Sequence, residues 1–92
     1  MVVEEFPFTQ QQISQNVFVR EFDKGVLTEE LVWHRDRNSR IVEVIRGEDW
    51  HLQLDNQMPV PLIEGLSYTI PANKYHRIKR GTTNLIVRIT EL

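Results

Sequence analysis

The chain has 92 residues with 40% apolar and 26% charged side chains, a formal net charge of −2 and no cysteine. This length leaves room for one soluble domain with a single modest hydrophobic core. The lack of cysteine excludes disulfides, thiolate metal ligands and cysteine nucleophiles, and the interleaving of basic with acidic residues argues against a nucleic-acid-binding surface.

The N-terminal stretch MVVEEFPF has acidic residues where a signal peptide needs positive charge, and no apolar run is long enough to span a bilayer. We therefore expect a cytoplasmic protein without a membrane partner. Residues 1–20 are predicted to form an N-terminal strand or arm, in which the glutamine-rich segment 8–14 makes a short turn or helix.

The rest of the chain consists of short runs rich in β-branched and aromatic residues and bounded by turn-forming residues. The predicted strands are 16–22, 30–34, 40–46, 50–55, 67–71, 75–80 and 84–91. Strands of this number and length in a chain of this size predict a single all-β domain, an antiparallel sandwich or barrel.

The packing of the largest side chains follows from this architecture. Trp33 and Trp50 are predicted to fill the core or a dimer interface, because aromatic side chains dominate both kinds of contact. Glu43 lies on the outward face of its strand and is predicted to pair with a nearby arginine. A small core without disulfides is only marginally stable, so burial at a partner surface favours a homodimer.

His34 and Asp36 are two residues apart at the end of a predicted strand. In an extended chain, such side chains point to the same side. His76 lies on a later predicted strand and shares a face with Ile78. Spacing alone leaves open whether the two histidines meet.

The sequence contains neither a nucleophile elbow nor a glycine-rich phosphate loop, so serine-based hydrolysis and nucleotide binding are not expected.

From residue 28 onwards the sequence resembles a single-domain cupin. The two motifs of that family have the forms G-x5-H-x-H-x(3,4)-E-x6-G and G-x5-P-x-G-x2-H-x3-N. The positions that agree with these motifs are His34, Gly47, Gly65, Pro71 and His76.

Other motif positions differ from the family pattern. Asp36 stands in place of the second histidine, and Arg40 in place of the ligand glutamate. Thr28 replaces the opening glycine and Arg80 the closing asparagine. Asn73 replaces the glycine of the second motif; because asparagine tolerates the left-handed conformation, it can hold the same turn.

The resemblance implies a small jelly-roll barrel in which His34, Asp36 and His76 converge as ligands of a divalent metal ion. Two imidazoles and one carboxylate form the three-ligand face of non-haem iron enzymes, and they also suit zinc, manganese, nickel or cobalt. The implied chemistry is that of a small-molecule oxygenase, isomerase or lyase, in which an open coordination position serves the substrate.

Arg40 allows two interpretations, since a guanidinium cannot ligate a metal. It can bind the carboxylate of a small anionic substrate while the metal holds the reacting end, or it can pair with Asp36 and withdraw that carboxylate from the metal. The second interpretation corresponds to an alternative function, a non-catalytic binding or interaction module without a metal.

Overall fold

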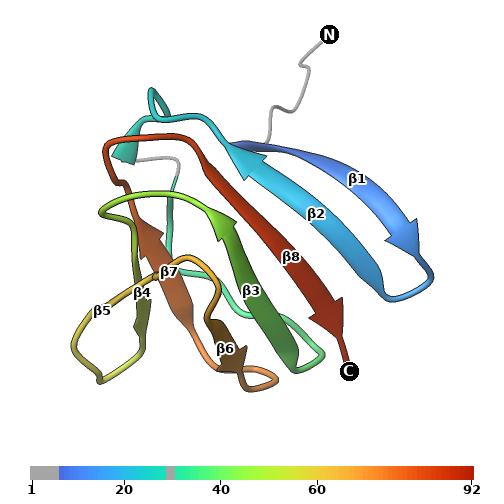
Figure 1. Ribbon diagram of the computed structural model, residues 1–92. Coiled ribbons are helices and arrows are strands. Elements are labelled where there is room, and N and C mark those ends of the chain that lie inside the picture. Colours follow the sequence, from blue (N-terminus) through green and yellow to red (C-terminus); the bar gives the residue numbers. More distant parts are fainter. Residues whose placement is uncertain (1–6, 29–30) are drawn as a thin grey trace, which may run out of the picture.

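The computed structural model describes residues 7–28 and 31–92, which form two antiparallel β-sheets facing one another (Figure 1). The larger sheet has the strand order β1-β2-β8-β3-β6, and the smaller one β5-β4-β7. The strands are β1 (Phe8–Ser14), β2 (Val17–Phe22), β3 (Arg40–Arg46), β4 (His51–Leu54), β5 (Val60–Pro61), β6 (Ser67–Ile70), β7 (His76–Lys79) and β8 (Leu85–Glu91). The predicted all-β antiparallel jelly roll is confirmed. In the described part of the chain, no helix has the length and apolar character needed to cross a membrane.

Segment 8–14 is a strand, so the predicted turn or helix is wrong there. It pairs with β2 from Phe8↔Phe22 to Ser14↔Val17, at the edge of the larger sheet. All its side chains except that of Phe8 are exposed. A strand that is exposed on both faces shows no alternation of apolar and polar residues, so periodicity could not reveal it.

The predicted strand 30–34 is also absent; Glu30 lies outside the described residues, and 31–33 form no ladder. His34 makes an isolated antiparallel bridge with His76, in which His34 N donates to His76 O at 3.0 Å and His76 N donates to His34 O at 2.8 Å. In a strand Val32 would share the face of His34 and Leu31 would lie on the opposite one, but Leu31 is only 8% exposed and Val32 is 59% exposed. The alternation in this segment is too short to form a strand and the chain turns after one bridge.

Strand β5 lies between the predicted strands 50–55 and 67–71, where no strand was predicted. It contains only Val60 and Pro61, which pair with Leu52 and His51 of β4. Two residues are too few to produce a periodic pattern, so only its pairing partner identifies it as a strand.

The core lies between the two sheets and is built from the inward side chains of both. Trp50, Val44 and Leu85 are essentially inaccessible to solvent, and the indole Nε1 of Trp50 donates a hydrogen bond to Thr83 O at 2.7 Å. The prediction for Trp50 is confirmed. Trp33 is 40% exposed and lies outside the core of a single chain, with the guanidinium carbon of Arg77 4.6 Å from its ring centroid.

Two features of the cupin-like motifs fix the backbone beside the cavity. Asn73 has φ = 62°, which confirms the left-handed turn expected of it, and its amide donates to Asp36 O at 2.7 Å. In the same loop, the amide of Ala72 donates to Ser39 Oγ at 2.9 Å. The turn before β7 is therefore fastened to the segment that carries Asp36, although Asn73 and Asp36 are 37 positions apart along the chain.

Candidate metal-binding site

A cavity of about 410 Å³ lies between the sheets, within the usual range of small-molecule pockets, roughly 300–1,000 Å³. Most of its wall is apolar, with Phe22 and Leu85 from the larger sheet and Leu52 and Ile78 from the smaller one. The charged or ionisable residues that line it are Arg20, His34, Asp36, Arg40 and His76. A few convergent polar groups in an apolar pocket are typical of a ligand site.

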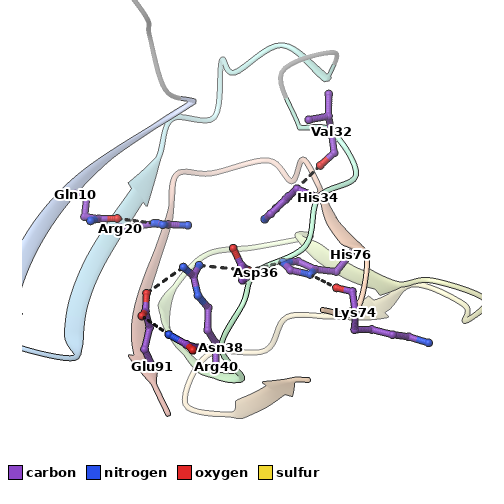
Figure 2. A network of polar contacts seen from close by, with 10 residues as sticks. All are labelled: Gln10, Arg20, Val32, His34, Asp36, Asn38, Arg40, Lys74, His76 and Glu91. Atoms are coloured by element: carbon purple, nitrogen blue, oxygen red, sulfur yellow. Dashed lines mark hydrogen bonds and ion pairs between the residues drawn. The ribbon is translucent and has the colours of Figure 1, made fainter. Parts of the chain in front are cut away.

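The structure brings His34, Asp36 and His76 together at one side of the cavity (Figure 2). One potential ligand atom from each lies within 4.8 Å of the others. The imidazole centroids are 4.2 Å apart, and His76 Nε2 lies 3.4 Å from Asp36 Oδ2. The backbone bridge between the two histidines produces this arrangement, because it places His76 beside a residue only two positions before Asp36.

Backbone carbonyl groups orient both imidazoles in the same way. His34 Nδ1 donates to Val32 O at 3.1 Å, and His76 Nδ1 donates to Lys74 O at 2.9 Å. A carbonyl oxygen only accepts hydrogen bonds, so Nδ1 carries the proton and Nε2 of the neutral ring keeps a free lone pair. Metal-binding histidines are commonly held by such a second contact.

Burial keeps His76 neutral. Its side chain is 5% exposed, and desolvation lowers its pKa below the usual value of 6.5, opposed by the hydrogen bond to Lys74. The imidazole of His76 therefore carries no charge at neutral pH, which is the form that ligates a metal ion.

Asp36 Oδ2 is buried without a hydrogen-bond partner. Its neighbours at 3.4 and 3.5 Å, His76 Nε2 and Arg40 Nη1, are at ion-pair distance but form no hydrogen bond with it. A buried carboxylate oxygen without a partner is costly. A divalent cation among Asp36 Oδ2 and two unprotonated imidazole nitrogens would satisfy this oxygen, so the residues fit a metal ion.

Arg40 is held by two carboxylates. Its Nη2 donates to Glu91 Oε1 at 3.1 Å, and its Nη1 lies 3.5 Å from Asp36 Oδ2. Asn38 Nδ2 donates to the other oxygen of Glu91 at 3.4 Å. Sequence reasoning missed Glu91, because its direct pairing with Arg40 follows from the register of β3 and β8.

Sequence reasoning also missed Arg20 as a cavity residue. On β2, Arg20 lies between Phe18 and Phe22 at alternate positions, and both phenylalanines are buried. This alternation, visible in the sequence, places Arg20 on the inward face. Burial and then the charge of Arg40 lower the pKa of Arg20 to about 10, so its guanidinium remains protonated at neutral pH.

The two sheets form the cupin fold, and solved structures with this arrangement are similar to the chain. An RmlC-like cupin from Shewanella frigidimarina is 21% identical with a TM-score of 0.70, over 95% of this chain and 78% of that one. The DMSP lyase DddQ from Ruegeria pomeroyi is 14% identical with a TM-score of 0.76, over 92% of this chain and 46% of that one. A crystal structure of Fe(II)-HppE with an alternative substrate is 16% identical with a TM-score of 0.65, over 83% of this chain and 41% of that one.

At these identities the comparisons establish the fold. The chain spans less than half the length of two DMSP lyase chains to which it is similar, 36% and 46%. No family model matches the sequence, and no curated protein sequence does.

Proposed function

We propose that this protein binds one divalent metal ion through His34 Nε2, Asp36 Oδ2 and His76 Nε2. The observation that carries the proposal is the unpartnered buried oxygen of Asp36 next to two imidazoles whose Nδ1 atoms are already engaged. This donor set suits iron, manganese, zinc, nickel or cobalt.

The metal would serve chemistry on a small anionic molecule in the cavity. Of the similar structures, one is an Fe(II) enzyme and others are lyases, which supports a metal-dependent enzyme of the oxygenase, isomerase or lyase type. When bound, the ion would supply a Lewis acid or a dioxygen site. The chain's own residues orient the ligands: the carbonyls of Val32 and Lys74 hold the imidazoles, and Arg40 holds Asp36.

The charges around the cavity favour an anionic substrate. Arg20 and Arg40 are balanced by Asp36 and Glu91, and both histidines are neutral when they ligate a metal. A divalent ion would therefore leave two positive charges in excess. Because a low-dielectric cavity opposes uncompensated charge, an anion would bind there with the metal.

The test is the metal content of protein purified without an affinity tag. We expect about one metal ion per chain in the wild type, and a loss of most of it in His76→Ala and in Asp36→Asn. His51→Ala is the matched control, because His51 Nδ1 contacts the carbonyl of Asp49 as the other histidines contact theirs, but His51 lies outside the cluster. Equal metal content in the His76→Ala and His51→Ala proteins would contradict the ligand set.

The contact between Arg40 and Asp36 supports a second candidate, a metal-free binding module. The 3.5 Å ion pair is the pairing that would withdraw the carboxylate from a metal. The same measurement separates the two candidates. If the wild type retains no more metal than His76→Ala, even after incubation with zinc or manganese, the protein is a metal-free binding module.

A further inference from the structure

Arg20 is a cation on the cavity wall that forms no ion pair with a carboxylate among the described residues, although Asp36 and Glu91 act on its charge from a longer distance. Its Nε donates to Gln10 Oε1 at 2.7 Å, and its guanidinium carbon lies 4.0 Å from the ring centroid of Phe8 and 5.0 Å from that of Phe18. Among the residues that the structure describes, none accepts a hydrogen bond from its two terminal nitrogens. Figure 2 shows these nitrogens directed away from Gln10, toward the side where His34 and Asp36 lie.

The contacts of Arg20 fix the orientation of its guanidinium group and leave most of its N–H donors free. The rings restrict the plane of the guanidinium, and Gln10 occupies only the Nε proton. The four remaining N–H groups form the fork that matches a carboxylate with two parallel hydrogen bonds. A fork held in place before binding loses less conformational entropy when a ligand arrives.

Arg40 has less hydrogen-bonding capacity to offer a ligand than Arg20 has. Glu91 and Asp36 already lie at 3.1 and 3.5 Å from its terminal nitrogens. A substrate carboxylate would compete with both, and Glu91 would lose a hydrogen bond or Asp36 an ion-pair contact.

We propose that Arg20, rather than Arg40, anchors the ligand of this cavity, and that the ligand is a small carboxylate with an apolar body. The apolar walls match the body, and the guanidinium, whose terminal nitrogens have no hydrogen-bond acceptor among the described residues, matches the carboxylate. The assignment rests on the proposed function in that it names the substrate class of that site. The contact with Arg20 itself does not require the metal.

The test uses butanoate and its uncharged isostere butanamide as probes, titrated into metal-stripped full-length protein at neutral pH. Binding is followed by calorimetry and by the NMR signal of the Arg20 Nε–H group. We expect butanoate to bind about ten to a hundred times more tightly than butanamide, and to shift the Arg20 signal. In Arg20→Met this preference falls to less than about threefold, and in Arg20→Lys, which keeps the charge without the fork, it is intermediate.

Arg88→Met is the matched control. Arg88 is also on the larger sheet, but its side chain is 53% exposed and pairs with Glu43 outside the cavity, so its removal should leave the preference unchanged. An Arg20→Lys protein that is folded by circular dichroism and binds butanoate as the wild type does would overturn the assignment, as would equal binding of the two probes by the wild type. Because the protein is metal-free, a failure of the metal proposal does not produce either result.

Discussion

At the scale of single residues, neighbouring ionic pairs on the same two strands have different roles. The register of β3 and β8 places Arg40 opposite Glu91 and Glu43 opposite Arg88. Arg40 is 13% exposed and also faces Asp36, whereas Arg88 is 53% exposed. Glu43 thus has the arginine partner predicted for it, but water screens that pair. Arg40 is part of the cavity wall, and Glu91 holds it from outside that wall.

Glu91→Gln should therefore destabilise the protein more than Glu43→Gln. Loss of the Glu91 charge leaves a mostly buried guanidinium short of a partner, at a cost of about 1–3 kcal/mol, whereas the exposed pair contributes at most about 1 kcal/mol. Chemical denaturation of both variants measures the difference in the free energy of unfolding. Equal losses would show that Arg40 does not depend on Glu91.

At the scale of elements, the turn before β7 sets the position of the candidate site. It holds Asn73 at positive φ and donates two hydrogen bonds to the segment 36–39. The edge strand β1 contributes in the same way, because its pairing with β2 sets Gln10 opposite Arg20. Both elements carry few buried side chains, and they act mainly through backbone hydrogen bonds.

The stability of variants at position 73 should follow the preference of each residue type for the left-handed backbone conformation. Asn73→Ala replaces a residue that tolerates the left-handed region with one that does not, and should cost about 1 kcal/mol, whereas Asn73→Gly should remain within about 0.5 kcal/mol of the wild type. Thermal denaturation of metal-free protein provides both values. A glycine variant less stable than the alanine variant would contradict this account.

At the scale of the whole molecule, the candidate site joins parts of the chain that are remote in sequence. Asp36 and His34 lie in the segment before β3, and His76 begins β7 in the other sheet. A ligand shared by these segments would bind only the folded protein. Metal binding would therefore stabilise the whole domain by mass action.

Addition of a metal ion to stripped protein should raise the midpoint of thermal unfolding. At a free concentration of one hundred times Kd, the gain is about 2.7 kcal/mol, which for a domain of this size corresponds to roughly 10–20 °C. The expected increase is the same in His51→Ala and absent in His76→Ala. An increase that His76→Ala retains would place the bound metal elsewhere.

The sequence by itself determined the class of fold and most of the strands, because β-branched alternation and turn residues are local signals. It also determined the positions that could ligate a metal, since residue types and motif spacing are visible without coordinates. The segments 8–14 and 31–34 were assigned wrongly for a related reason: the first shows no alternation and the second only a short one, so only pairing with a neighbour decides whether such a segment is a strand.

Only the tertiary structure decided which side chains meet. The bridge between His34 and His76 and the pairing of Arg40 with Glu91 depend on strand order and register, which join residues 42 and 51 positions apart. The cavity likewise exists only when the two sheets face each other, and only their packing makes Arg20 part of its wall. Contacts between distant segments are set by the packing of the whole chain, so no local pattern of residues encodes them.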